Sequence, residues 1–227
     1  MKCLWKGEHM RKVIAVVCAV AVLAGCKPTG STGGGAGSSA DGLTIAEALE
    51  KIPAGEEDRS GYDRDKFEHW VDADGDGCDT REQVLIDEKT AGSVKDCKVT
   101  GGKWLSYYDG KEWTKSTDVD IDHLVPLAEA WDSGAKSWDA DRRRRYANDL
   151  GDDRTLVAVT DNVNQEKSDQ DPAEWLPPLK SVQCRYAAEW VAVKLRWGLS
   201  ADDAERRKLK ELAGGCPDER VTVKAAD

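Results

Sequence analysis

The sequence of 227 residues has no long hydrophobic run, and this absence limits the class of protein. Its longest apolar stretch, Val13–Leu23, is about a dozen residues, whereas a transmembrane helix needs about 20. Arg11 and Lys12 precede this stretch, and small residues lead from its end to Cys26. The arrangement predicts a lipoprotein-type signal peptide over residues 1–25, with Cys26 as the lipid acceptor. A plain secreted protein is the alternative.

The chain also lacks net positive charge, because 33 basic residues face 43 acidic ones and leave a net charge of −10. Removing the signal peptide would take away four basic residues and one acidic residue, so the remainder would be near −13. Attraction to phosphate supplies most of the non-specific affinity of proteins for nucleic acid. Composition therefore argues against a nucleic-acid partner unless a metal ion and a local basic patch offset the charge.

No two cysteines have the short C-x-x-C spacing that zinc sites usually show. Of the seven cysteines, three fall in the first 26 residues, which leaves an even number for an oxidising compartment. Four cysteines allow three pairings, and closeness in the sequence favours Cys78–Cys97 and Cys184–Cys216. A zinc site is the alternative.

Signatures of several functional classes are missing as well. The sequence has no recognition-helix signature and no zinc finger, so nothing in it is suited to read base edges. It also lacks the paired glutamates or the Cys/His arrangement expected of a cell-wall hydrolase. The chemistry must therefore be inferred from the motifs that the sequence does contain.

Two short stretches carry that chemistry. Residues 120–126, Asp-Ile-Asp-His-Leu-Val-Pro, alternate carboxylates with apolar residues, so a strand would place Asp120 and Asp122 on the face opposite His123. Residues 156–160 form a second β-rich run, and Asp161 or Asn162 would cap a helix after it. The alternative for the first stretch is an edge strand whose histidine only makes a hydrogen bond.

Together the two stretches resemble the HNH endonucleases, in which two strands and a helix hold one metal ion. The matching residues are Asp122-His123, Leu156-Val157 and Asn164-x-x-Lys167. They look especially like the HNH domains of RNA-guided effector nucleases and the nuclease domains of modification-dependent restriction enzymes. A wider similarity to secreted actinobacterial HNH-family proteins covers approximately residues 62–216. The chain departs from the pattern at Arg154-Thr155, where many relatives carry an asparagine that helps to position the catalytic loop.

The resemblance implies an α+β fold with a ββα-metal (HNH) core, a small antiparallel sheet and surrounding helices, including a C-terminal αα-hairpin. It also implies roles for individual residues. His123 would take a proton from the attacking water, which suits an imidazole near neutral pH. Asp122 and Asn164 would hold one divalent ion, Mg or Mn, because their oxygen ligands are hard. Lys167 would touch the phosphate or cap the site.

A second candidate metal site is an acidic loop near residue 75. Its carboxylates follow the spacing by which an EF-hand loop wraps calcium, although Gln83 stands where such a loop carries its last glutamate. The alternative is a polar turn whose carboxylates cap the next helix. The candidate calcium ligands are Asp72, Asp74, Asp76 and Asp79.

One basic cluster lies between the two halves of the HNH-like motif. Arg142, Arg143 and Arg145 belong to a run of four arginines within a helix expected over residues 139–150. A helix spreads such a run around its girth, so about two side chains can face one ligand. We expect these arginines to contact phosphate; the alternative is a solvated face balanced by neighbouring acids.

The remaining pattern predicts the domain organisation. Residues 26–40 are a Gly/Ser-rich flexible tether, residues 41–220 a single HNH-like nuclease domain, and residues 221–227 a tail. Within the domain we expect a β-meander with turns at Gly101-Gly102 and Asp109-Gly110. Further helices are expected over residues 43–52, 80–88, 127–134, 179–199 and 200–214.

The sequence therefore predicts an exported, metal-dependent phosphodiesterase that cuts nucleic acid, DNA rather than RNA, with little sequence preference. Its expected partners are the phosphate backbone of nucleic acid and, through Cys26 alone, a membrane, with no obligate protein partner evident. The alternative is a surface-tethered calcium-binding or interaction module in which the HNH-like fold is not catalytic.

Overall fold

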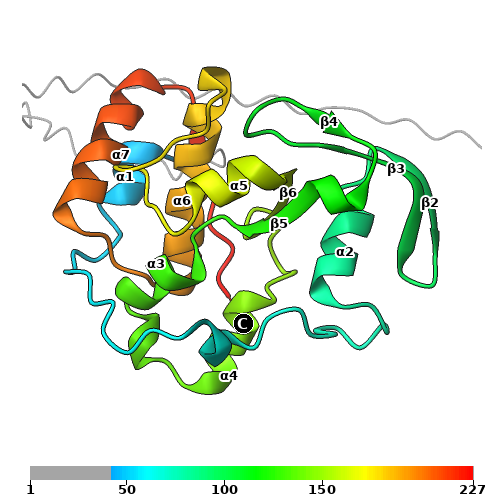
Figure 1. The fold of residues 1–227 in the computed structure, drawn as a ribbon. Coiled ribbons are helices and arrows are strands. Elements are labelled where there is room, and N and C mark those ends of the chain that lie inside the picture. The colour runs from blue at the N-terminus through cyan, green and yellow to red at the C-terminus, as the bar shows by residue number, and fades with distance from the viewer. Residues whose placement is uncertain (1–41, 227) are drawn as a thin grey trace, which may run out of the picture. The chain divides into compact units, whose positions relative to one another are not determined.

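A two-stranded antiparallel ribbon with one helix packed on it lies at the centre of the fold. The computed structural model describes residues 42–226. Strand β5 (Val119–His123) pairs with β6 (Leu156–Thr160), and helix α5 (Asp161–Lys167) follows β6 directly and contacts both strands (Figure 1). This ββα unit, with its surrounding helices and small antiparallel sheets, confirms the expected α+β class.

The rest of the described chain surrounds this unit. A three-stranded antiparallel sheet has the order β2-β3-β4, and β1 pairs with β7. The elements are β1 (Leu43–Thr44), α1 (Ile45–Leu49), α2 (Thr80–Asp87), β2 (Ala91–Lys95), β3 (Lys98–Leu105), β4 (Glu112–Trp113), α3 (Leu127–Asp132), α4 (Ala140–Ala147), α6 (Gln183–Trp197), α7 (Asp203–Gly215) and β7 (Arg220–Val221). Short 3-10 turns cover Arg64–Phe67, Ser116–Asp118, Ala135–Ser137 and Lys180–Val182. None of the described helices is long and apolar enough to cross a membrane.

The two faces of the ribbon belong to different hydrophobic clusters. Val119 and Ile121 of β5 pack with Leu156 of β6 against α2 and β3. Val157 and Val159 of β6 join the larger cluster that α3, α6 and α7 share. Because side chains alternate along a strand, Asp120 and Asp122 face this second cluster while His123 points to the other side, as the sequence predicted.

Both expected disulfides are present. Cys184–Cys216 joins the beginning of α6 to the end of α7, so the predicted αα-hairpin is cross-linked. Cys78–Cys97 joins the acidic loop before α2 to the turn between β2 and β3. That turn corrects one prediction, because the hairpin reverses at Asp96 and Cys97, both at positive φ, and not at Gly101-Gly102.

The place of Gly102 and the start of α7 also differ from expectation, for local reasons. Gly102 lies within β3, where an added Cβ would come within 2.2 Å of the Trp104 ring, so this glycine serves packing and not a turn. Helix α7 begins at Asp203, three residues after the start of the expected range, because the carboxylate of Asp202 accepts the hydrogen bond from the amide of Glu205 and so caps the helix there.

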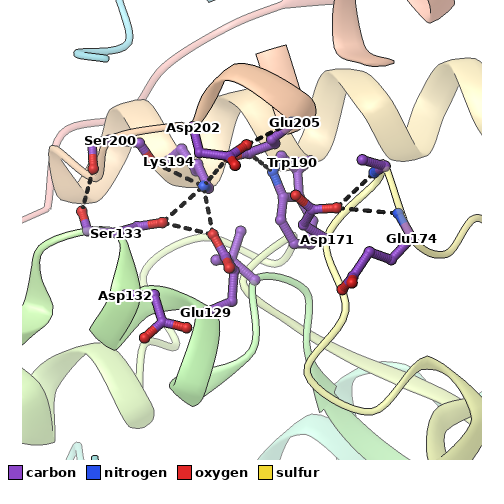
Figure 2. Close-up of polar contacts among 12 residues, drawn as sticks. Glu129, Asp132, Ser133, Asp171, Glu174, Trp190, Lys194, Ser200, Asp202 and Glu205 are labelled. Atoms are coloured by element: carbon purple, nitrogen blue, oxygen red, sulfur yellow. Dashed lines mark hydrogen bonds and ion pairs between the residues drawn. The ribbon is translucent and has the colours of Figure 1, made fainter. Parts of the chain in front are cut away.

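A buried lysine fastens α3, α6 and α7 together (Figure 2). Lys194 is fully buried, and its Nζ donates to Glu129 Oε1 at 2.7 Å and to Glu205 Oε2 at 2.5 Å. The same ammonium donates to the hydroxyl of Ser133 and to the carbonyl of Ser200. With four acceptors around one charge, the buried ammonium is fully hydrogen-bonded, as its burial requires.

Removing the Lys194 ammonium should therefore be strongly destabilising. Lys194→Met leaves Glu129 and Glu205 as buried carboxylates without their cation, and we expect the free energy of unfolding to fall by about 3–5 kcal/mol. Urea unfolding measures the change. Lys210→Met on exposed α7 surface is the control and should change stability by less than about 0.5 kcal/mol. A loss for Lys194→Met no larger than the control's would contradict this account.

A carboxyl group at the end of α2 accepts a hydrogen bond from the main chain of strand β6. Glu88 lies at the end of α2, and its Oε2 accepts a hydrogen bond from the amide of Ala158 at 3.0 Å. Burial raises the pKa of Glu88 to about 7, although the hydrogen bond from Ala158 opposes the shift. The folded protein therefore binds a proton at Glu88 more tightly than the unfolded chain does.

This shift predicts the sign of a pH effect on stability. As pH rises from about 4.5 to 7, the unfolded chain ionises Glu88 before the folded protein does, so the free energy of unfolding should fall by up to about 3 kcal/mol. Glu88→Gln keeps an acceptor for Ala158 and removes the titration. Chemical unfolding at pH 5 and 8 should show the variant to be less pH-dependent than the wild type; equal pH dependence would contradict the shift.

Candidate active site

The two halves of the HNH-like motif meet at one hollow in the surface. A cavity of about 500 Å³ at the end of β5 is lined by residues from β5, α3, α5 and the segment that enters the 3-10 turn Arg64–Phe67. Asp122, His123 and Asn164, which lie about forty positions apart in the chain, all line it. The remaining lining residues of importance are Tyr62, Arg64, Ser168 and Asp169.

His123 is held by a main-chain carbonyl. Its Nε2 lies 2.9 Å from the carbonyl oxygen of Ala147, the last residue of α4, and its ring stands between those of Trp70 and Tyr146. A carbonyl only accepts, so Nε2 carries the hydrogen and Nδ1 has the lone pair. The side chain is 5% exposed, and burial lowers the pKa of His123 to about 3. The imidazole is therefore neutral at pH 7 and able to accept a proton.

Asp122 is held on the other face of β5. Its Oδ1 accepts a hydrogen bond from Lys167 Nζ at 3.0 Å, and its Oδ2 accepts one from the Tyr108 hydroxyl at 2.6 Å and lies 2.9 Å from the Lys167 ammonium as an ion pair. Burial raises the pKa of Asp122 and lowers that of Lys167, and their mutual attraction opposes both shifts. Lys167 is fully buried and also donates to the carbonyl of His123, so it serves Asp122 and not a phosphate at the surface.

Asn164 approaches the same strand from α5. Its Nδ2 donates to Asp120 Oδ2 at 3.2 Å, which leaves the amide oxygen of Asn164 available. Burial raises the pKa of Asp120, and the nearby carboxyl group of Asp161 acts in the same direction. Asp120 thus orients the carboxamide of Asn164.

These residues fit a hard divalent ion. A carboxylate offers about four lone pairs, and the hydrogen bonds from Lys167 and Tyr108 use one on each oxygen of Asp122. One lone pair on each of these oxygens and the amide oxygen of Asn164 remain, and the hollow has room for water molecules as further ligands. Such an oxygen-only set suits Mg or Mn better than zinc.

The carbonyl that holds His123 is fixed by the residue next to it. The carboxamide of Asn148 accepts from the Val71 amide and the Thr80 hydroxyl, and it donates to the carbonyls of Glu68 and Arg144. All four of its hydrogen-bonding positions are therefore used. Asn148 joins the end of α4 to the loop before α2, and no sequence pattern pointed to it.

Although Thr155 departs from the HNH pattern, hydrogen bonds still hold the loop that leads into β6. The carbonyl of Thr155 accepts from the Leu124 amide at 3.0 Å, and its hydroxyl donates to Asp149 Oδ2 at 3.0 Å. Asp149 in turn accepts from Arg196 and from the indole of Trp197. Residues 147–155, which we call the anchoring loop, are thus hydrogen-bonded to His123 and Leu124 at the end of β5.

Arg64 supplies positive charge that sequence reasoning did not assign. Its exposed guanidinium lines the hollow beside His123, and it lowers the pKa of that histidine. Among residues 42–226, no carboxylate lies within ion-pair distance of Arg64 in this structure. A guanidinium without an acidic partner can receive a phosphate at no cost in broken ion pairs.

The arginines expected to bind phosphate have other contacts. Arg142 donates to the carbonyl of Trp197 and stacks on Trp138, and Arg143 donates to three main-chain carbonyls, those of Lys66, Ala135 and Trp138. Arg145 pairs with Asp141 on the helix surface. Arg142 and Arg143 therefore fasten α4 to its neighbours, whereas Arg145 remains exposed, and nucleic-acid binding by these three residues stays a prediction.

The acidic loop brings three of its four predicted calcium ligands together. Carboxylate oxygens of Asp72, Asp74 and Asp76 lie within 4.8 Å of one another, and all three residues are exposed. Asp79 instead caps α2, because its Oδ1 accepts from the amide of Glu82 at 2.8 Å. The capping role considered from the sequence therefore applies to Asp79.

Comparison with known proteins agrees with this geometry. The family model for the C-terminal domain of GmrSD restriction endonucleases matches residues 80–212, a range that includes both halves of the motif. An uncharacterized secreted protein of Arthroderma benhamiae is 45% identical over 204 residues, which cover 89% of this chain and 98% of that protein. No solved structure matches the chain.

Proposed function

Because the chain belongs to the family of the C-terminal domain of GmrSD restriction endonucleases, we propose that it is an exported, metal-dependent endonuclease. The substrate would be the phosphodiester backbone of nucleic acid, DNA rather than RNA, cut with little sequence preference. The observation that carries the proposal is that Asp122, His123, Asn164 and Arg64 all line one hollow.

In this proposal His123 is the general base. Its Nδ1 accepts a proton from the attacking water while the Ala147 carbonyl holds Nε2–H. A pKa of about 3 makes the free imidazole a weak base. A bound phosphate adds negative charge beside the ring, which favours the protonated form and raises the pKa when substrate is present.

The other residues bind and orient. Asp122, held by Lys167 and Tyr108, and Asn164 would share the divalent ion, Mg or Mn. The ion, when bound, would stabilise the charge that develops on the phosphate and on the leaving oxygen. Arg64 would hold a non-bridging phosphate oxygen and offset the negative charge of the chain at the one place where the substrate must approach.

Export is supported by two observations. The Arthroderma benhamiae relative is described as secreted, and the chain has two disulfides of the kind that persist in oxidising compartments. The predicted signal peptide, the lipid-acceptor cysteine Cys26 and the tether over residues 26–40 lie outside the described residues. Anchoring of one domain, residues 41–220, to a membrane through Cys26 is therefore a proposal from the sequence.

The second candidate function is a calcium-binding module without catalysis. The cluster of Asp72, Asp74 and Asp76 supports a Ca site on this protein, whichever function is correct. Oxygen ligands from three carboxylates suit calcium, which tolerates flexible geometry. A nuclease with a calcium loop and a non-catalytic calcium module differ only in whether nucleic acid is cut.

The proposed function is tested by plasmid nicking. Wild-type protein should convert supercoiled DNA to open circles with Mg or Mn and not with chelator, whereas His123→Ala should reduce nicking by at least about 100-fold. His69→Ala removes the other described histidine as a control and should retain activity. Wild-type protein without metal-dependent nicking of DNA or RNA would leave the calcium module as the better explanation.

The role of Arg64 gives a separate prediction. Arg64→Gln should lower kcat/KM for nicking by about 100-fold, because one charged donor to the reacting phosphate is lost. Arg64→Lys should lose less, since it keeps the charge without the paired donors. Arg207→Gln, at an exposed position on α7, is the control. Activity of Arg64→Gln equal to that of the control would remove Arg64 from the site.

The two metal sites can be separated by calorimetry. Asn164→Ala should weaken Mn binding at least tenfold and leave Ca binding unchanged, and Asp74→Asn should have the opposite effect. Asn162→Ala, exposed on the same helix as Asn164, is the matched control. Unchanged Mn affinity of Asn164→Ala would show that this residue is not a ligand, and unchanged Ca affinity of Asp74→Asn would exclude the loop.

A further inference from the structure

The last described residues, 222–226, lie along the anchoring loop. Arg154 Nη1 donates to the carbonyl of Thr222 at 2.9 Å, and Lys224 Nζ donates to the carbonyl of Gly151 at 2.6 Å. Residues 222–225 are exposed and belong to no helix or strand. Hydrogen bonds therefore hold most of this terminal segment in place, and only Ala226 at its end packs against the hydrophobic core.

Arg196 links the terminal segment to the interior of the molecule. Its Nη1 donates to the carbonyls of Lys224 and Ala225 at 2.7 and 2.8 Å. Its Nε and Nη2 donate to the two oxygens of Asp149, each at 2.7 Å. Both Arg196 and Asp149 are more than nine-tenths buried, so this bidentate pair is sheltered from water.

Asp149 connects Arg196 to the end of strand β5, next to His123. Its carboxylate also accepts from the hydroxyl of Thr155, whose carbonyl accepts from the amide of Leu124. Leu124 directly follows His123. At the other end of the same loop, the carbonyl of Ala147 accepts from the His123 ring. The anchoring loop therefore contacts His123 and its neighbour from two sides, and Arg196 holds the loop.

We propose that the terminal segment is a positioning element for His123, acting through Arg196, Asp149 and the anchoring loop. The inference rests on the proposed function, because positioning matters only if His123 is the base. Without residues 222–226, Arg196 Nη1 loses two carbonyl acceptors and the buried pair opens to water. A ring displaced by about 1 Å from its productive position costs about 100-fold in rate at worst.

The contacts suggest a matched pair of variants. Ending the chain after Val221 removes every carbonyl acceptor of the segment. The triple variant T222A/V223A/K224A keeps those carbonyls and removes only side chains, the Lys224 ammonium that donates to Gly151 among them, since residues 225 and 226 are already alanine. Main-chain acceptors are the effective groups in the proposal, so the two variants should differ.

The readouts are nicking kinetics, metal affinity and hydrogen exchange. We expect the shortened protein to lose about tenfold in kcat, with KM and Mn affinity unchanged, and the triple alanine variant to stay within twofold of the wild type. The Leu124 amide should exchange faster in the shortened protein, while the amides of β3 (Lys98–Leu105) should not change. A general loss of stability would move both sets of amides.

Three results would overturn the proposal: a shortened protein with kcat within twofold of the wild type, equal losses in both variants, or unchanged exchange at Leu124. If the shortened protein does not fold, Arg196→Lys decides, because lysine keeps a positive charge for Asp149 and cannot reach the two carbonyls as well. Unchanged kcat in that variant would equally reject the role. If wild-type protein does not cut nucleic acid, the proposed function fails, and exchange at Leu124 still tests the link to the terminal segment.

Discussion

The hydrogen bond between the His123 ring and the carbonyl of Ala147 is the contact on which the rest of the site depends. It decides which ring nitrogen carries the hydrogen and in which direction the other one points. A single hydrogen bond to a loop would be a weak constraint if the loop could move. Asn148 and Asp149 prevent that movement from two sides, because each joins the loop to a different part of the molecule.

Several charged groups of this acidic protein lie in its interior. Lys167, Lys194 and Arg196 are buried, and each pairs with at least one buried carboxylate. Replacing either member of such a pair leaves an uncompensated charge, so each pair fixes the relative placement of two elements. Arg64 differs, because its guanidinium is exposed in the hollow and has no carboxylate partner among the described residues. The buried cations hold elements of the fold together, whereas Arg64 is exposed and able to contact a substrate.

Local features of the fold could be predicted from the sequence. Alternation along residues 119–123 gave the correct faces for Asp122 and His123, and closeness in the sequence gave both disulfide pairings. The turn at Asp96 and Cys97 could not be predicted in this way, because neither residue type is favoured at positive φ over the glycines nearby. There the Cys78–Cys97 cross-link and strand pairing override local preference.

Contacts between distant segments were beyond the reach of sequence patterns. No sequence pattern pointed to Tyr108, yet its hydroxyl donates to Asp122. The tail after residue 220 carried no pattern, yet its carbonyls accept from Arg196, 28 and 29 positions away. Both depend on main-chain or hydroxyl groups meeting a charge across the fold, and such groups leave no periodicity to read.

The way in which Asp122 is held has a consequence for how the site would be loaded. Each oxygen of the Asp122 carboxylate already accepts a hydrogen bond, one from Lys167 and one from Tyr108, so the pocket keeps its shape before any cation arrives. Metal uptake would then be a local exchange of ligands and water on a rigid frame, not an event that organises the chain. An enzyme built like this would be fully folded but inactive until it reached surroundings that contained the ion.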